Sequence, residues 1–508
     1  MTKRLKQRVV ATLFGVSILF LACAAPAATQ PPRATAAPVS SPAAPASPRA
    51  STPAASASPA TAPAFVPVGK FALSPASGQW GTAVTATAQG LAPGTAYDVA
   101  WATATGKWLL SEDRSEYKGR EFTPVERKLT SATTDSSGAF TATFAVPNDF
   151  GYMHDVLVKK GPELLNKSAF EIDMVTTITP TSGPVGTPIT VEVKGIGYRQ
   201  YQNSFQLSYD NKYTGWVTSV TTQGYAKLVI PATGLPGKHF VQLGHSEFNA
   251  PYLNPQQQPV VADRPFPRLP FTITEGPAVL PPPAANQSFA VIAARPVERG
   301  IWTDPYGAFV GDQIALRANG LQTGADVEIT WSTMVGNRSV TGFQQKVSTL
   351  ARTRTDATGA FTLPFAVPDD LGGRHEMTAK IGDAVVAKTD LYILSNAFPI
   401  SVDRGPSGTK VKLQLKGVGW TETEQIYHMV VDNSFAGYAC AFQSAGDITI
   451  ETVISGEPGW HFIDLYPGIY RGAETRPANY KIPQLTALDD HPGEKLPIYR
   501  YAFLITAP

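Results

Sequence analysis

The second half of the chain repeats the first, and this duplication limits the folds that the sequence can adopt. Residues 183–243 align without a gap to residues 405–465, at a constant offset of 222. Within this alignment "GPVGTPITVEVKGIGY" matches "GPSGTKVKLQLKGVGW", and "PGKHFVQL" matches "PGWHFIDL". A second matching pair, 134–154 and 355–375, precedes these segments at an offset of 221. The repeats therefore follow the order A–B–A′–B′, a duplicated two-domain unit.

Each of the four units contains one segment with the same pattern. The segments are "GTAVTATAQG" (Gly81–Gly90), "GTPITVEVKG" (Gly186–Gly195), "GDQIALRANG" (Gly311–Gly320) and "GTKVKLQLKG" (Gly408–Gly417). Small or apolar side chains alternate with other residues between the two glycines, which is typical of a β-strand with one buried face. Helical periodicity is nearly absent, and Gly, Pro, Asn and Asp separate short strand-like runs. This pattern predicts antiparallel β-sandwiches.

The opening "SGPVGTPITVEVKGIGY" of the first B unit resembles bacterial immunoglobulin-like repeats of the IPT/TIG type. The resemblance is clearest over residues 178–211 and 400–433. The A units resemble the Ig-like repeats of bacterial surface proteins more loosely, through "VPxDxGxxH". The resemblance implies an all-β fold of four tandem Ig-like antiparallel sandwiches and a location at the cell surface. It implies no catalytic residue, because these motifs specify strands and turns.

The first residues have the features of an exported lipoprotein. Four basic residues precede an apolar run over residues 9–22, as in a secretory signal peptide. The segment "LFLAC" resembles a bacterial lipobox, in which the cysteine, here Cys23, is lipidated and becomes the first residue of the mature protein. The alternative is an uncleaved membrane anchor that extends toward Ala28. Both place the rest of the chain in an exported, membrane-anchored state, at the cell surface or the periplasmic face.

A low-complexity segment separates the signal from the repeats. It is almost entirely Ala, Pro, Ser and Thr, and it lacks the large apolar side chains that would offset its ordering entropy. We therefore expect a disordered tether. The predicted organisation is a signal peptide at 1–22, the tether at 23–64, A at 65–174, B at 175–276, a proline-rich linker at 277–288, A′ at 289–396 and B′ at 397–508.

Charge, cysteine content and missing motifs exclude several classes of protein. Removing the four basic residues of the signal changes the formal net charge from +2 to −2, so the exported part has no basic field for nucleic acid. Cys440 is the only cysteine besides Cys23, and we expect it to be a small buried side chain in a hydrophobic core. The sequence contains no GxSxG, HExxH or CxxC motif and no phosphate-binding glycine loop. We therefore predict a non-enzymatic protein without a cofactor.

Four of the seven histidines occupy one repeated position, just after a glycine-bearing turn. They are His154, His239, His375 and His461. The apolar residues that follow keep a period of two, which places each imidazole on the inward face of a strand. The expected role is a hydrogen bond to a turn carbonyl. A metal site would need more ligands, because only the A units have an acidic residue, Asp149 or Asp370, five positions earlier. We therefore predict no metal site.

The repeated segments "DNKYTG" and "DNSFAG" lie between apparent strands. Asp210–Asn211 and Asp432–Asn433 could be calcium ligands. However, Asp and Asn bond their own backbone and tolerate left-handed conformations, and a glycine follows each Asn four positions later. The pattern favours hairpin turns.

The segments in which the copies differ are the candidates for partner binding. The first A unit has nine additional residues in a charged segment that includes Trp108, Tyr117 and Arg120. The last part of B′, which includes Tyr470 and Tyr480, is ten residues longer than its counterpart in B. Loops this long are often functional, and tyrosines near Asn, Gln and Arg suit a binding surface. The alternative is a tail that covers an edge strand of its own sandwich.

Together these features predict a non-enzymatic, lipid-anchored bacterial surface protein. Four sandwiches in series would form a semi-rigid rod, and their end loops would contact an unknown envelope protein or glycan, in adhesion or envelope scaffolding. An alternative is a carbohydrate-binding accessory module of an exported enzyme system, in which the loop aromatics stack on sugar rings. A third hypothesis is a hydrolase with a composite site, which would need carboxylates to converge with several of His245, His428 and His491.

Overall fold

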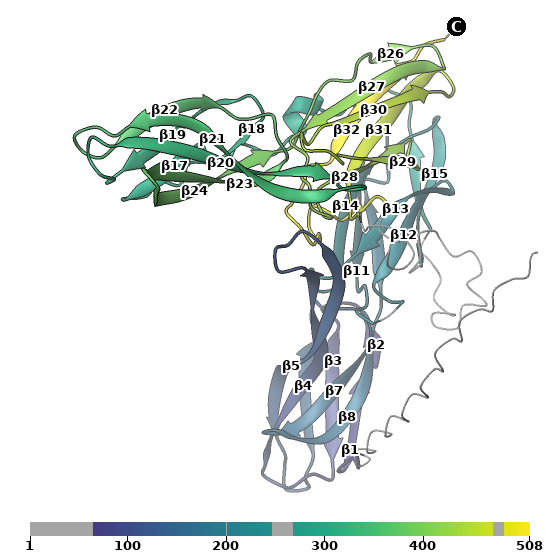
Figure 1. The fold of residues 1–508 in the computed structure, drawn as a ribbon. Helices are drawn as coiled ribbons and strands as arrows, with labels where there is room; N and C mark the ends of the chain where they lie inside the picture. The colour runs from purple at the N-terminus through teal and green to yellow at the C-terminus, as the bar shows by residue number, and fades with distance from the viewer. Residues whose placement is uncertain (1–64, 200, 246–267, 471–481, 508) are drawn as a thin grey trace, which may run out of the picture. The chain divides into compact units, whose positions relative to one another are not determined.

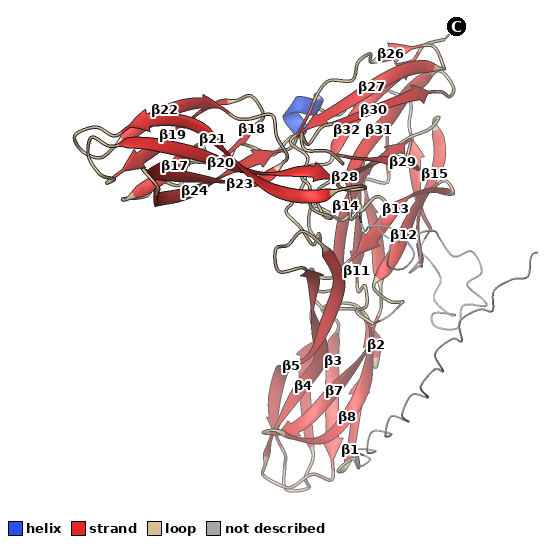
Figure 2. Cartoon of the chain, viewed as in Figure 1, coloured by secondary structure: helices blue, strands red, loops and turns tan. Residues whose placement is uncertain are grey.

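Strands make up nearly all the regular structure of this chain (Figures 1 and 2). The computed structural model describes residues 65–199, 201–245, 268–470 and 482–507. The signal peptide, Cys23, the tether and Tyr480 lie outside these ranges. The described strands form four three-stranded and four five-stranded sheets, one of each per repeat. This confirms the predicted all-β fold of four tandem Ig-like sandwiches, which keep the names A, B, A′ and B′.

Sandwich A has the strand arrangement that all four units share. Its strands are β1 (Lys70–Ser74), β2 (Ser77–Gly78), β3 (Ala83–Gln89), β4 (Ala96–Leu110), β5 (Tyr117–Thr133), β6 (Phe140–Ala145), β7 (Tyr152–Lys160) and β8 (Glu163–Ile172). One sheet has the order β1-β3-β6 and the other β2-β8-β7-β4-β5. The pairs are antiparallel except β2 with β8, which are parallel. The first stretch of the sandwich thus contributes one strand to each sheet.

The other sandwiches repeat this order of strands. Sandwich B consists of β9 (Val175–Thr179), β10 (Ser182–Gly183), β11 (Pro188–Lys194), β12 (Ser204–Tyr209), β13 (Lys212–Thr218), β14 (Tyr225–Pro231), β15 (Gly237–His245) and β16 (Arg268–Ile273). Sandwich A′ consists of β17 (Gly300–Asp304), β18 (Gly307–Phe309), β19 (Gln313–Asn319), β20 (Asp326–Asn337), β21 (Gly342–Arg354), β22 (Phe361–Ala366), β23 (Gly373–Ile381) and β24 (Ala384–Leu394). Sandwich B′ consists of β25 (Asn396–Ala397), β26 (Arg404–Gly405), β27 (Thr409–Lys416), β28 (Ile426–Val431), β29 (Ser434–Cys440), β30 (Ile448–Ile454), β31 (Gly459–Pro467) and β32 (Tyr499–Ile505).

The alternating segments of the sequence form the central strand of each three-stranded sheet. In β3 every second side chain is buried, namely Val84, Ala86 and Ala88, and β11, β19 and β27 have the same pattern. These side chains join those of the facing sheet in one hydrophobic cluster per sandwich. Because each buried Val, Leu or Ile contributes about 1.5–3 kcal/mol, alternation of this kind is sufficient to fix which face of the strand points inward.

The two Asp–Asn segments are hairpin turns, as the sequence predicted. They connect β12 to β13 and β28 to β29. Both residues of each turn have positive φ, 48° and 64° in B and 48° and 59° in B′. A two-residue loop with positive φ at both positions is a type I′ turn, which matches the right-handed twist of the flanking strands.

Sandwiches B and B′ pack against each other, although A′ lies between them in the sequence. Burial along β12 and β28 is nearly continuous instead of alternating. The hydrophobic cluster of B includes Val430, Tyr466 and Leu485, which belong to B′. The amide of Asn433 in the B′ turn donates to the carbonyl of Pro231 at 2.8 Å. The strands β12 and β28 therefore have both faces covered.

Contacts between the tandem sandwiches are not limited to neighbours in the sequence. The extra residues of the first A unit do not form a loop but extend β4 and β5 into a long hairpin. Trp108 of this hairpin donates from Nε1 to Asp490 Oδ1 of B′ at 3.0 Å. The backbone N–H of Tyr117 donates to Glu422 Oε2 at 2.8 Å. The nine additional residues give the hairpin enough length to connect the first sandwich to the fourth.

The proline-rich linker connects B to A′ in the sequence and is held by B and B′. It contains η2 (Ala284–Gln287), a 3-10 helix and the only helix among the described residues. Ala284 belongs to the hydrophobic cluster of B′. The side chain of Gln287 exchanges two hydrogen bonds of 2.7 Å with the backbone of Arg500. Near its start, the backbone N–H of Val279 donates to Val185 at 2.9 Å. The linker is thus a docked segment that contributes to the contact between B and B′.

Candidate functional site

The four repeated histidines have the turn-carbonyl partner that the sequence suggested. In each sandwich Nε2 lies within hydrogen-bonding distance of the carbonyl oxygen four residues earlier. The pairs are His154 with Phe150 (2.8 Å), His239 with Leu235 (2.7 Å), His375 with Leu371 (2.8 Å) and His461 with Glu457 (2.9 Å). The imidazole thereby closes the turn before its strand, which is a structural role.

The acidic residue of the A units is occupied by donors from the chain itself. Asp149 is fully buried and accepts hydrogen bonds from Trp101 Nε1 (2.9 Å), Thr103 Oγ1 (2.9 Å) and the backbone N–H of Phe150 (2.8 Å). Asp370 accepts the same three bonds in A′. No cluster of three or more His, Cys, Asp or Glu side chains that could hold a metal ion occurs within the described residues. The absence of a metal stays a prediction for the whole chain.

The B units use a different carboxylate, which the sequence reasoning missed. His461 Nδ1 lies 2.6 Å from Asp432 Oδ2, and the other oxygen of this carboxylate accepts from the N–H of Phe462 at 3.0 Å. Asp210 and His239 form the same pair in B. The sequence contains a sign of this pair, because the aspartate of the Asp–Asn turn precedes the histidine by 29 residues in both copies. Each turn aspartate therefore has a second role as the partner of a histidine.

All four imidazoles face oxygen acceptors at both ring nitrogens. In the A units the second acceptor is a carbonyl, at 2.9 Å from His154 and 3.1 Å from His375. A neutral imidazole has a single N–H, so only the doubly protonated form can donate both bonds. Consistent with this geometry, the hydrogen bond to Asp432 raises the pKa of His461 above its ordinary value. At His461 the geometry therefore favours the charged imidazole.

Asp432→Asn is expected to lower the free energy of unfolding of B′ by about 1–2 kcal/mol at acidic pH, because it removes the charged partner of His461. A raised histidine pKa contributes stability that is complete below the unfolded pKa of 6.5 and is lost as pH rises through the folded pKa. Calorimetric melting at several pH values should therefore show a difference from wild type that shrinks in alkaline solution. Asp383→Asn, in an exposed turn, is the control. A loss of stability that does not change with pH would contradict the pairing of Asp432 with a charged His461.

The aromatic and basic residues predicted to bind a partner in the first A unit lie in contacts within the chain. Tyr117 is 1% exposed, and its ring is 6.0 Å from that of Trp108. Trp108 meets Trp216 of B edge-on at 6.3 Å. Arg120 Nη1 donates to Asn203 Oδ1 at 3.0 Å. The structure brings these residues together as the contact between A, B and B′, and binding of a partner stays a prediction.

Asp490 holds this contact together. The carboxylate is 1% exposed and accepts hydrogen bonds from sandwich B and from the hairpin of sandwich A. The donors are Thr218 Oγ1 (3.0 Å), Val220 N (2.7 Å), Thr221 N (2.9 Å), Thr221 Oγ1 (2.9 Å) and Trp108 Nε1 (3.0 Å). One side chain of the B′ tail thus links three sandwiches.

The remaining predicted residues lie in the interior or at its edge. The N–H of Tyr470 donates to the carbonyl of Glu422 at 2.7 Å. Cys440, expected to be buried, is half-buried at the end of β29. His428 is buried, and this burial lowers its pKa to about 3. His491 Nε2 is 2.8 Å from the carbonyl of Thr423. His428 is thus held by packing and His491 by hydrogen bonds, both within B′.

Two cavities are open at the junctions. One, of about 450 Å³, is lined by Arg114 of A, Arg374 of A′ and Glu424 and Glu494 of B′. Burial raises the pKa of Glu424 to about 7, the nearby Glu494 adds to this shift, and the two arginines oppose it. Glu424 therefore retains its proton at a pH at which an exposed glutamate is ionised.

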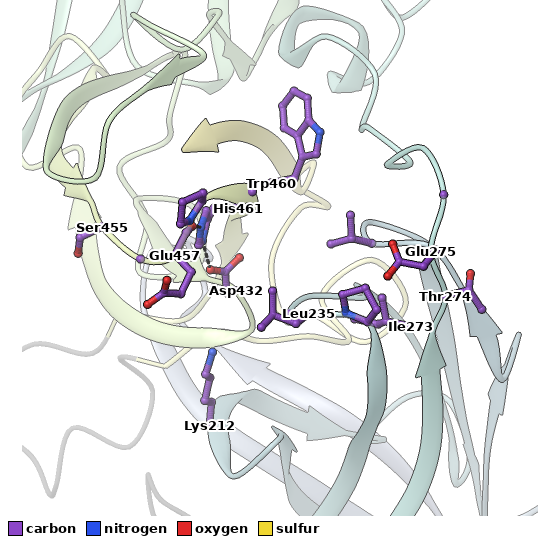
Figure 3. A pocket seen from close by; sticks show the side chains of 17 residues that line it. Lys212, Leu235, Ile273, Thr274, Glu275, Asp432, Ser455, Glu457, Trp460 and His461 are labelled. Carbon is purple, nitrogen blue, oxygen red and sulfur yellow. Dashed lines mark hydrogen bonds and ion pairs between the residues drawn. The ribbon is translucent and has the colours of Figure 1, made fainter. Parts of the chain in front are cut away.

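The second cavity, of about 480 Å³, lies between B and B′ and is called the turn cavity here (Figure 3). Its walls are two equivalent turns of the repeat, which contain Leu235 in B and Glu457 in B′. Lys212, Glu275 and Trp460 also line it. Figure 3 shows Glu457 and Glu275 on opposite sides, Lys212 at the lower edge and Trp460 at the upper edge. The turn cavity is the candidate ligand site.

No protein-family model and no curated protein matches this chain. Solved structures match at low similarity. A membrane anchored protein from Corynebacterium diphtheriae is 10% identical, with 86% of this chain and 91% of that chain covered and a TM-score of 0.17. The Yersinia pseudotuberculosis adhesin InvE is 10% identical, with 46% and 66% covered and a TM-score of 0.18.

The native alpha-2-macroglobulin of E. coli is 9% identical, with 84% of this chain covered and a TM-score of 0.17. The chain spans only 30% of the length of that protein. Likenesses at this level carry no argument about function. In the part of the chain that the structure describes, no helix has the length and hydropathy of a membrane span.

Proposed function

We propose that this chain is an exported, lipid-anchored, non-enzymatic surface protein that presents an interlocked set of Ig-like sandwiches for adhesion or envelope scaffolding. The anchor is Cys23, and residues 23–64 are the tether. The partner is an envelope protein or a glycan, and neither nucleic acid nor a cofactor takes part.

The observation that carries this proposal is the linkage through Asp490. Its carboxylate is hydrogen-bonded to both A and B while its backbone belongs to B′. Arg338 of A′ also donates to the carbonyl of Trp420 in B′. Such links hold surface loops of different sandwiches in fixed relation, and a pre-organised surface binds with a smaller ordering cost. A presenting protein needs this property.

The non-enzymatic part of the proposal is supported by how the reactive side chains are used. Asp149, Asp370 and Asp490 are filled by donors from the chain itself. The four repeated histidines each use both ring nitrogens in structural hydrogen bonds. A general acid or base must instead be within reach of a bound substrate.

Surface labelling of intact cells tests the proposal. We expect an antibody raised against residues 65–508 to label intact cells of the source bacterium, and added protease to remove that label. Cys23→Ala should release the protein into the medium or the periplasm, because the anchoring thiol is gone. An intracellular protein probed in parallel shows that the cells are intact. Retention of the chain inside protease-treated cells would contradict the proposal.

A further inference from the structure

We infer that the turn cavity binds an uncharged glycan. This inference rests on the proposed surface location and names the class of ligand that the presented surface would take. The cavity volume of about 480 Å³ lies within the range of about 300–1,000 Å³ that is common for ligand sites.

The cavity has an apolar wall suited to a sugar ring. Leu235 is 66% exposed and lines the cavity. Pro236 also lines the cavity, and Trp460 lies half-buried at its upper edge (Figure 3). One face of a pyranose consists of C–H groups, and it can pack on an indole or an aliphatic side chain while the hydroxyl groups point to the edges.

Three polar side chains at the cavity are available to those hydroxyl groups. No hydrogen bond or ion pair within the described residues engages the side chain of Lys212, Glu275 or Glu457. A carboxylate accepts two or more hydrogen bonds from hydroxyl groups, and an ammonium group donates up to three. Because Glu275 and Glu457 stand on opposite sides of the cavity, a ring between them could be bonded at both edges (Figure 3).

The charges of the cavity select against an anionic ligand. Asp432 is already paired within the chain, because its Oδ2 lies 2.6 Å from Nδ1 of His461. The groups that remain are two carboxylates, Glu275 and Glu457, and one ammonium, Lys212. An acidic sugar or a phosphate would meet a net negative site, and like charges across an interface oppose binding. A neutral glycan avoids this repulsion and still uses all three groups.

The duplication supports a site that is specific to the pair of B units. Trp460 occupies the position that Lys238 has in the first copy, at the same offset of 222. Only B′ therefore supplies an aromatic ring at this position, and it supplies it at the cavity that the two copies share. A single B unit would contain half of the lining.

Affinity electrophoresis of the full-length protein tests the inference. The protein is run through gels that contain an uncharged polysaccharide (laminarin, galactomannan or xyloglucan) or an anionic one (alginate). We expect retardation by at least one uncharged polysaccharide and none by alginate. Trp460→Ala and Glu457→Gln should each weaken binding by about tenfold or more, because a stacked indole and a hydrogen-bonded carboxylate contribute most of the affinity of such a site.

Trp302→Ala is the matched control, because Trp302 is a half-buried tryptophan on β17 of A′, far from the turn cavity in the chain. The Trp302→Ala variant should be retarded as much as the wild-type protein. The melting temperature of each variant shows that the variant is folded. Absence of retardation in every uncharged gel would overturn the inference, as would retardation that Trp460→Ala leaves unchanged or that only alginate causes. Surface labelling is independent of this assay, so failure of glycan binding would leave the surface proposal intact.

Discussion

Asp490→Ala is expected to release the β4–β5 hairpin from B and B′ and to lower the free energy of unfolding by about 3 kcal/mol or more. A hydrogen bond to a buried charge contributes about 1.5–3 kcal/mol, and Asp490 accepts bonds from Trp108, Thr218, Val220 and Thr221. Alanine would leave Thr218 Oγ1 and the N–H of Val220 buried without this acceptor. Calorimetry should show a lower melting temperature, and hydrogen–deuterium exchange should be faster at the amides of Val220 and Thr221.

Asp489→Ala provides the control for this experiment. Asp489 is the preceding residue in the same turn, and its side chain is exposed. We expect its melting temperature and its exchange rates to match those of wild type. If Asp490→Ala also left the exchange of Val220 unchanged, the carboxylate would not be the link between the sandwiches.

Glu424→Gln is expected to stabilise the protein by about 3 kcal/mol in mildly alkaline solution and to have little effect near pH 4. Glu424 is only 8% exposed, and burial raises its pKa from 4.5 to about 7. The folded state therefore keeps a proton that the unfolded chain has released. The free energy of unfolding is therefore highest below pH 4.5 and decreases as the pH rises to about 7. Above about pH 7 the decrease is complete, and a pKa shift of this size corresponds to a loss of about 3 kcal/mol. Glutamine cannot ionise, so it removes the cost.

Denaturant unfolding of both proteins between about pH 4 and pH 9 measures this difference. The amide of glutamine can still accept the hydrogen bond that Thr421 Oγ1 donates to Glu424 at 2.8 Å, so the packing should be kept. Glu451→Gln, on the exposed face of β30 in the same sandwich, should give a curve parallel to wild type. Equal stability of Glu424→Gln and wild type at alkaline pH would show that Glu424 is ionised in the folded protein.

The sequence was sufficient to predict the sandwiches, because their determinants are local. Alternation in segments such as Gly81–Gly90 fixes a strand and its buried face, and the Asp–Asn pairs fix type I′ turns. The histidines followed from the same logic, since their carbonyl partner is four residues away. Repetition strengthened each of these predictions by providing a second copy.

The contacts between sandwiches could not be predicted in this way. Asp490 lies in the tail of B′, where the two copies do not match, and its donor Trp108 is 382 residues away. A charged segment with aromatic residues has the same composition in a partner-binding loop and in a hairpin that packs against its own chain. Trp108 and Tyr117 therefore suggested an external surface. Only the register of β4 with β5 shows that the segment is long enough to contact B′.

The face-to-face packing of B and B′ has a consequence for synthesis. Segments of the chain become available in sequence order, so the outer face of β12 and β13 can form about 200 residues before β28 and β31 can cover it. During that interval Trp216 lacks its later partners Ile469 and Ile482 and lies on an incomplete interface, which is the kind of transient apolar surface that chaperones bind. The order of translation thus makes the first half of this protein dependent on the second.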